Sequence, residues 1–353
     1  TMIGTTGQAY DNGMRFLQMY YALPVAMILI SVLFVPFFHN AHIYTAYEYL
    51  ERRFDAKTRS FTSLLFLLSR GMSCGVVISA PAVVMSIVLG WNLPLTCLAI
   101  GLPTAVYTMF GGVQAVAWTD VKQMVLIVFG LVAVFIALVL GLPDGIGLTD
   151  ALGVAGVTGR LQTFDFSFDL TKQYTFWSGT IAALFLFLSY FGTDQSQVQR
   201  YLTAKSVGEA RTSLLMSAYW KIPLQALVLL VGVFLFLFYL FTPPPLVFNP
   251  VHEKTVRASA RAADYEATEA KFATAYDARK QAATSLAEAR RSGDTQRVAQ
   301  AAAEFTSRDA EVVGIRKEAT TIVREASGDR SFSDVNYVFP TFVMTHLPVG
   351  LVG

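Results

Sequence analysis

Charged residues are scarce in this sequence. Only 15% of its 353 residues are Asp, Glu, Lys or Arg, whereas 54% are hydrophobic. An ordinary soluble domain has roughly a quarter of its residues charged, so the shortage argues against a soluble protein and for a membrane protein. The net charge of +2 gives no reason to expect a nucleic-acid partner.

Catalytic and metal-binding groups are also few. The two cysteines, Cys74 and Cys97, lie inside apolar stretches, and the four histidines are scattered apart from the close pair His39 and His42. The sequence contains no glycine-rich phosphate-binding loop and no nucleophile elbow. These absences argue against an enzyme, and we expect none of the residues to be catalytic.

Long apolar stretches are what the sequence does contain. Stretches of about 20 apolar residues predict membrane-spanning helices. We predict six complete spans, near 17–38, 61–90, 93–113, 120–142, 174–193 and 214–242. Residues 1–10 are interpreted as the outer end of a further span, and residues 331–353 as the start of the next one. The sequence therefore predicts an all-α, multi-pass integral membrane protein with a transmembrane core over residues 1–250.

The basic residues of the short loops predict the orientation of these spans. The loops at 39–60 and 194–212 are rich in Arg and Lys, whereas the short loops of the opposite side carry only Arg15, Arg160 and Lys172. Basic loops remain on the cytoplasmic side of a membrane. We therefore expect the 39–60 and 194–212 loops to be cytoplasmic, in the cell (inner) membrane.

Residues 251–330 differ from the rest of the chain. Ala, Glu, Arg, Lys and Gln dominate this segment, and a Ser-Gly-Asp triplet interrupts it at 292–294. Good helix formers on both sides of a turn predict an extracellular or periplasmic helical hairpin, a slender coiled coil with a thin alanine-rich seam. Two interpretations stay open: an extramembrane insertion that decorates a loop, or an arm that docks a protein partner.

Of the charged residues within or beside predicted spans, where charge is costly and often functional, we take two as site candidates. Lys221 lies about two turns into the span at 214–242, close to Pro223. It is a countercharge to a substrate or a gate residue, or else a lysine whose amine reaches the interface. Asp120 begins the span at 120–142, and either caps that helix or faces an ion pathway.

Two uncharged runs also suggest a transport site. Tyr190 and Phe191 precede a polar run at the end of the span at 174–193. This pattern fits a gate over a cavity that opens to the cytoplasm, and equally an interfacial aromatic belt. The small polar residues at 4–8 fit either a broken transmembrane helix whose backbone lines a binding site or an ordinary loop.

Four segments together resemble the sodium/solute symporter family, which includes glucose, proline, pantothenate, iodide and monocarboxylate carriers. They are 45–54 (TAYEYLERRF), 111–120 (GGVQAVAWTD), 194–202 (DQSQVQRYL) and 339–348 (FPTFVMTHLP). The resemblance implies a leucine-transporter fold, two five-helix repeats of inverted topology. This chain would supply the part from the outer half of core helix 1 to the start of core helix 8, with the hairpin as an insertion.

The resemblance also implies a function. It implies a secondary active symporter that imports a small polar organic solute with Na+ by alternating access, with membrane lipid around it. The solute stays open between an organic anion, a sugar and a polyol. The alternatives are a transporter-like solute sensor and an assembly protein that acts through the 251–330 hairpin, which is where a protein partner would bind.

Site residues carry over from the family position by position. Asp120 matches an aspartate near the sodium route to the cytoplasm, and Tyr190 matches an inner-gate tyrosine with Phe191 beside it. Lys221 matches a lysine of sugar-type members. Thr1 should lie beside the substrate, and Gln18 and Tyr20 are weaker pocket positions. The principal sodium ligands of the family come from parts of core helices 1 and 8 that we expect to lie outside this chain.

Overall fold

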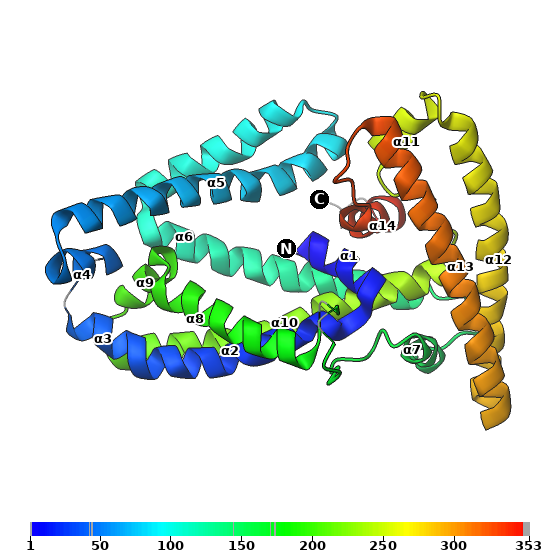
Figure 1. Cartoon of the computed structure of the whole chain (residues 1–353), viewed down its shortest axis with the longest axis horizontal. Helices are drawn as coiled ribbons and strands as arrows, with labels where there is room; N and C mark the ends of the chain where they lie inside the picture. The colour runs from blue at the N-terminus through cyan, green and yellow to red at the C-terminus, as the bar shows by residue number, and fades with distance from the viewer. Residues whose placement is uncertain are drawn as a thin grey trace. The chain divides into compact units, whose positions relative to one another are not determined.

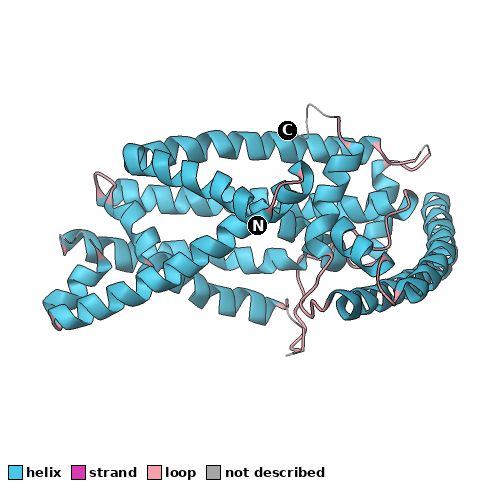
Figure 2. Ribbon diagram, turned by 90° about the horizontal axis from the view of Figure 1, so that it is seen from above, coloured by secondary structure: helices cyan, strands magenta, loops and turns pink. Residues whose placement is uncertain are grey.

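The computed structural model describes residues 2–41, 43, 45–143, 145–169, 171–172 and 174–348, with the side chains of 2, 80, 84, 87 and 88 left aside. Throughout this part of the chain the regular structure is helical (Figure 2). The predicted pocket position Thr1 lies outside the described residues.

The helices follow one another as shown in Figure 1. In chain order they are α1 (Met2–Asn12), η1 (Gly13–Phe16), α2 (Leu17–Leu29), η2 (Ile30–Phe34), α3 (Val35–Asn40), α4 (Ala46–Arg53), α5 (Ala56–Leu89), α6 (Leu93–Leu140), α7 (Leu148–Val157), η3 (Trp177–Ala182), α8 (Ala183–Thr193), α9 (Gln195–Leu202), α10 (Val207–Phe241), α11 (Pro250–Arg257), α12 (Ala262–Ser292), α13 (Thr295–Ser327), η4 (Val335–Tyr337) and α14 (Val338–His346). They form two compact units. The first comprises Thr1–Tyr21, Gly130–Ile181 and Lys221–Gly353, and the second Ala22–Phe129 and Ala182–Trp220.

Four helical runs among the described residues are long and apolar enough to cross a membrane: Ile3–Asn40, Ala56–Val83, Leu93–Leu140 and Val207–Phe241. The 48 residues of α6 far exceed the roughly 20 that one crossing needs. Gly112 has non-helical dihedral angles (φ 55°, ψ −152°) and divides α6 into two helices. Because this φ belongs to the left-handed half of the map, glycine is the residue that adopts it without strain. The single helix α6 therefore covers both spans predicted at 93–113 and 120–142.

A tight corner separates α1 from α2 in the first unit. Gly13 has a φ of +70°, and a side chain there would meet the backbone of Arg160 at 2.4 Å. The backbone N–H of Met14 donates to the carbonyl of Arg160 at 2.8 Å. The corner thus needs a glycine for its conformation and for the close approach of the Arg160 loop.

Two glycines allow α1 to pack closely against α10 and η4 in the same unit. A Cβ atom on Gly232 of α10 would lie 2.3 Å from the carbonyl oxygen of Thr6 and 2.6 Å from the Cβ of Ala9. On another side of α1, a Cβ on Gly7 would lie 1.9 Å from the carbonyl oxygen of Val335 in η4. The absence of side chains at these positions lets three segments approach at backbone distance.

The helices α12 and α13 form a hairpin that runs as a long pair in Figure 1. Its turn uses the Ser-Gly-Asp triplet. Gly293 ends α12 in a left-handed conformation (φ +72°), and the Asp294 carboxylate caps α13 by accepting from the N–H groups of Gln296 and Arg297 at 2.9 and 3.2 Å.

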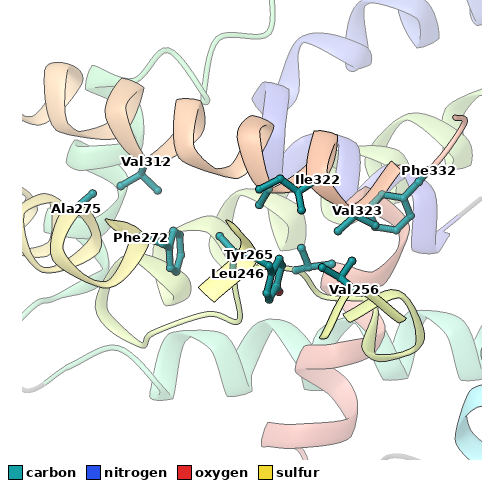
Figure 3. Close-up of a cluster of buried hydrophobic side chains, with 11 residues drawn as sticks. Leu246, Val256, Tyr265, Phe272, Ala275, Val312, Ile322, Val323 and Phe332 are labelled. Atoms are coloured by element: carbon teal, nitrogen blue, oxygen red, sulfur yellow. The ribbon is translucent and has the colours of Figure 1, made fainter. Parts of the chain in front are cut away.

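The base of the hairpin is a small core rather than a two-helix seam. Figure 3 shows Tyr265 and Phe272 of α12 packed with side chains from outside the hairpin helices. These include Leu246 before α11, Val256 in α11 and Phe332 after α13. The structure therefore gives no support to the slender coiled coil that we expected. Large apolar residues from outside the hairpin helices supply the packing that the alanine-rich seam lacks.

Candidate functional site

An aromatic cavity in the second unit contains the predicted gate. It has a volume of about 980 Å³, and its lining includes Phe34, Phe37, Tyr47, Phe66, Tyr190 and Asp194. These residues come from the η2–α3 stretch, α4, α5, α8 and the residue between α8 and α9. We call this space the aromatic cavity. Its mostly apolar walls and few polar groups are typical of small-molecule sites.

Tyr190 and Phe191 end α8 at this cavity. Tyr190 is 41% exposed and lines the cavity, whereas Phe191 is buried and lies edge-on to it with ring centroids 4.9 Å apart. The Tyr190 hydroxyl accepts a hydrogen bond from the Gln197 amide at 2.9 Å. The next residue, Gly192, faces the ring of Phe34, and a Cβ there would lie 3.3 Å from it. The hydrogen bond from Gln197 of α9 thus fixes the Tyr190 hydroxyl, while the Tyr190 ring stays accessible.

A polar frame fixes the end of the cavity at α4 and α9. The Asp194 carboxylate caps α9 by accepting from the Ser196 N–H at 2.8 Å. The Gln195 side chain accepts from the N–H of Ala46 at 2.8 Å and so ties α9 to the start of α4. Burial and the nearby Asp194 carboxylate raise the pKa of Tyr47, which therefore remains a neutral hydrogen-bonding group.

A π-helical stretch forms part of the cavity wall. The segment Ile30–Phe34 (η2) has π geometry, and Phe34 at its end lines the cavity. Such single-turn widenings of a helix often occur at functional sites because they displace side chains from the regular helical register. The sequence contains no signal that predicts this π-helical turn.

Asp120 lies far inside a helix. It is exposed on α6, eight residues after the break at Gly112, so it is not an N-cap. The capping interpretation of the sequence is therefore wrong, because the second helix of α6 starts at the glycine pair and not at the aspartate. The place of Asp120 on a sodium route stays a prediction.

Gln18 and Tyr20 lie on α2 in the first unit, close to the corner with α1. The Gln18 side chain is fully buried. Its amide accepts from the N–H of Asp165 at 3.1 Å and donates to the carbonyl of Tyr174 at 3.3 Å. Tyr20 is half-buried against Phe16, with ring centroids 5.9 Å apart. In this structure Gln18 anchors the 158–175 loop.

Lys221 lies on α10 two residues before Pro223, and its side chain is half-buried. It belongs to the first unit, as Gln18 and Tyr20 do, whereas Tyr190 and Phe191 belong to the second. The structure thus places Tyr190 in the wall of the aromatic cavity with Phe191 packed beside it, whereas Gln18, Tyr20, Asp120 and Lys221 do not line this cavity. In the described part of the chain, His, Cys, Asp and Glu side chains do not gather in groups of three or more that would hold a metal ion.

The first unit also contains a buried charge network that the sequence did not predict. The carboxylate of Asp309 in α13 pairs with Arg279 of α12 at 3.3 Å and with Arg160 of the loop after α7 at 3.4 Å. Arg160 also donates to the carbonyl of Tyr10 in α1 at 3.2 Å. Partners 149 residues apart along the chain leave no local signal by which a single sequence could reveal them.

Comparison with known proteins gives a family match over most of the chain. The model of the sodium:solute symporter family matches residues 1–270. The human sodium/iodide cotransporter is 30% identical over 246 residues, which cover 70% of this chain and 38% of that protein. The human sodium-coupled monocarboxylate transporter 2 is 33% identical over 214 residues, which cover 61% and 34%. The chain thus spans little more than a third of the length of these curated relatives.

A solved structure shows the same fold. It is the substrate-bound, outward-open state of a Na+-coupled sialic acid symporter, which superposes with a TM-score of 0.66 at 20% identity and covers 99% of this chain and 56% of that one. The predicted fold class, an all-helical bundle of the leucine-transporter type, is confirmed. The matched relatives carry the names of transporters.

Proposed function

This chain belongs to the sodium:solute symporter family, and from that premise we propose that it forms part of a symporter that imports a small polar solute together with Na+ by alternating access. The observation that carries the proposal is the family match over residues 1–270, which includes the aromatic cavity and its gate pair. A unit charge that moves down a potential of 100 mV supplies about 2.3 kcal/mol. Sodium entry is therefore sufficient to drive concentrative uptake of a solute.

We further propose that the solute is a small organic anion. Two of the matched relatives are named for anions, iodide and monocarboxylates. Lys221, half-buried in a helix that is long and apolar enough to cross a membrane, is a suitable countercharge because charged residues inside a membrane often mark a substrate site. Sugars and polyols are the competing solutes. We also propose that Asp120 lies on the sodium route, as its family position implies.

Uptake into liposomes that contain the full-length protein tests the function. Sodium gradients would be imposed while radiolabelled monocarboxylates, sugars, polyols and amino acids are screened in turn. We expect at least one monocarboxylate to accumulate only when sodium is higher outside. If solutes bind but none moves under any sodium gradient, the proposal fails and a solute sensor becomes the better interpretation.

Matched pairs of variants test the two predicted site residues. Lys221→Ala should abolish most anion uptake, whereas Lys205→Ala, which removes an exposed lysine from the loop after α9, should leave it unchanged. Tyr190→Phe removes the acceptor of the Gln197 hydrogen bond, a loss of about 0.5–1.5 kcal/mol, and should lower uptake about two- to tenfold. Tyr219→Phe, at a tyrosine that is 71% exposed, is its control. Equal uptake within a pair would remove that residue from the site.

The topology is part of the proposal. We propose that the 39–60 and 194–212 loops face the cytoplasm and that the hairpin α12–α13 faces the outside of the cell membrane. Single cysteines at Arg200 and Lys172, in a background with Cys74 and Cys97 replaced by Ser, would be labelled in intact cells with a membrane-impermeant thiol reagent. We expect labelling at 172 and none at 200. The reverse pattern would invert the assignment.

A further inference from the structure

A second cavity lies in the first unit, where the hairpin meets the end of α1. Its volume is about 360 Å³, which is within the range of small-ligand sites. Side chains from the end of α1, the loop after α7, α12 and α13 line it, including Tyr10, Arg160, Arg279 and Arg316. We call it the junction cavity. Neither the proposed sodium route nor the gate uses these residues.

The lining of the junction cavity carries more positive than negative charge. The basic side chains are Arg160, Arg279, Arg316, Lys317 and Arg324, and the acidic ones are Asp11, Asp309 and Asp334. Buried charges in proteins are normally paired, because an uncompensated charge in a medium of low dielectric constant is costly. An excess of cations around one cavity therefore calls for an anion.

One carboxylate serves the two most deeply buried arginines. Arg279 is 4% exposed and Asp309 is 8% exposed, and Asp309 pairs with both Arg279 and Arg160. Burial lowers the pKa of the Arg160 guanidinium, and the Asp309 carboxylate opposes that change. The Nε atom of Arg279 is buried without a hydrogen-bond partner among the described residues. Asp309 is thus the one carboxylate in direct ion-pair contact with these two guanidinium groups in the described part of the chain, while Asp11 acts on Arg160 from farther away.

Arg316 is satisfied by uncharged oxygens only. It donates to the carbonyls of Leu246 and Pro245 at 3.3 and 2.7 Å and to the Tyr10 hydroxyl at 3.1 Å. Its guanidinium also lies over the ring of Phe248 at 4.6 Å. The described residues place no carboxylate within ion-pair distance of it, although the charges of Asp11 and Asp334 act on it from farther away. A guanidinium has five N–H donors in a planar fork, so donors remain for a ligand.

The acidic groups of the lining do not cancel this excess. The Asp334 carboxylate is occupied by the backbone N–H groups of Phe248 and Asn249, at 2.8–3.1 Å. Burial raises the pKa of Asp334, and the Arg316 guanidinium opposes that change. Asp11 is exposed at the end of α1, where the charges of Arg316, Arg160 and Lys317 act on it. The amine of Lys317, exposed on α13, adds a mobile cation at the rim.

We propose that the junction cavity binds one small oxyanion, a carboxylate or an inorganic ion of the phosphate type, between Arg160, Arg316 and the Lys317 amine. Planar guanidinium forks match the two oxygens of such anions and form strong, charge-assisted hydrogen bonds. The rings of Tyr10, Phe236 and Phe248 form part of the wall.

The position of this site gives the anion a structural consequence. Arg160 packs against the corner at Gly13, and Arg316 of α13 donates to the Tyr10 hydroxyl of α1. An anion between them would connect the hairpin to the end of α1. Binding would therefore stabilise the docked hairpin by mass action.

Calorimetric titration of the purified full-length protein tests the site. Sodium acetate and sodium phosphate, each at constant total sodium, would be titrated separately so that a carboxylate and a tetrahedral oxyanion are distinguished. We expect saturable binding of at least one of them that Arg316→Gln weakens and that Lys221→Ala, which alters the proposed transport site, leaves unchanged. The unfolding midpoint should rise with the same concentration dependence. Absence of saturable binding by both anions would overturn the proposal.

Three variants locate the site. Arg316→Gln removes a charged hydrogen-bond donor and should weaken binding roughly 10- to 100-fold. Lys317→Gln removes only a rim charge and should weaken binding about two- to fivefold. Lys280→Gln is the matched control, because it is an exposed lysine of α12 that does not line the cavity.

The variants also keep the test decisive if one of them folds badly. Arg316→Gln is interpreted only if it unfolds cooperatively, and Lys317→Gln supplies the answer if it does not. Equal affinities in Lys317→Gln, Lys280→Gln and the parent protein would place the anion elsewhere. The test does not depend on transport, so a failure to find uptake and a failure to find this site remain separate results.

Discussion

The substitution Gly232→Ala probes how tightly α1 is held against α10. The Cβ that it adds would lie 2.3 Å from the carbonyl oxygen of Thr6, whereas carbon and oxygen normally stay about 3.3 Å apart even in close contacts. Relief of the clash therefore requires a movement of about 1 Å. The obstacle is backbone on a helix and not the end of a flexible side chain, so the movement must involve α1 as a whole.

The other side of α1 resists that movement. Gly7 faces the carbonyl of Val335 so closely that a Cβ there would lie 1.9 Å from its oxygen. Overpacking of this kind costs about 1–3 kcal/mol, and the better helix propensity of alanine returns up to about 1 kcal/mol. We expect Gly232→Ala to lower the free energy of unfolding by about 1–2 kcal/mol net.

A glycine in open space provides the control. Gly314 lies in the middle of α13, and a Cβ there meets nothing within 4 Å. Gly314→Ala should therefore raise the free energy of unfolding by about 0.5–1 kcal/mol through helix propensity alone. Both variants would be unfolded by denaturant in mixed micelles beside the parent protein. If Gly232→Ala proves as stable as Gly314→Ala, the close approach of α1 to α10 is not present in the protein and the reasoning is refuted.

Three further substitutions test other parts of the first unit. Asp309→Asn leaves Arg279 without its carboxylate and should lower the free energy of unfolding by about 3–5 kcal/mol, measured by denaturant titration. A decrease below about 1 kcal/mol would contradict a buried network. Hydrogen bonding from Ser167 lowers the pKa of Asp165 from 3.8 to about 2, so its stabilising contribution is present above pH 4 and lost as the pH falls to 2. Asp165→Asn should accordingly be less stable than the parent at pH 6, with a difference that shrinks between pH 4 and 2; a constant difference would exclude titration as the cause. Asn249→Ala removes the cap that accepts from two N–H groups of α11 and should cost about 1 kcal/mol, measured as a shift in the unfolding midpoint, whereas no shift would mean that the cap is dispensable.

Features that depend on neighbouring residues could be predicted from the sequence. Five of the six predicted spans fall in the long apolar helical runs, because a length of about 20 residues is set by the membrane itself, whereas the span predicted at 174–193 is the shorter helix Trp177–Thr193. The triplet at 292–294 gave the hairpin turn, because glycine and aspartate have local preferences at helix ends. The pair Tyr190 and Phe191 was located correctly at the end of its helix, and the structure adds the cavity beside it.

Features that depend on distant residues could not be predicted in this way. The break in α6 was placed before Asp120, since an aspartate often caps a helix, but the structure has it at Gly112, where the conformation itself requires glycine. The hairpin looked too thin to pack because its partners Leu246 and Phe332 lie outside 251–330. A single sequence does not say which segments meet, and the error about the hairpin has that origin. The error about α6 is local, because the aspartate was given more weight than the glycine pair before it.

The charge network at the hairpin base joins the hairpin to α1. The Asp309 carboxylate of α13 pairs with Arg279 of α12 and with Arg160 of the loop after α7. Arg160 also donates to the carbonyl of Tyr10 at the end of α1. Loss of one partner from a buried ionic network costs about 3–5 kcal/mol. We therefore infer that the hairpin and α1 stay together in a transporter of the proposed kind. Both interpretations of the segment 251–330, a loop decoration and a docking arm, stay predictions.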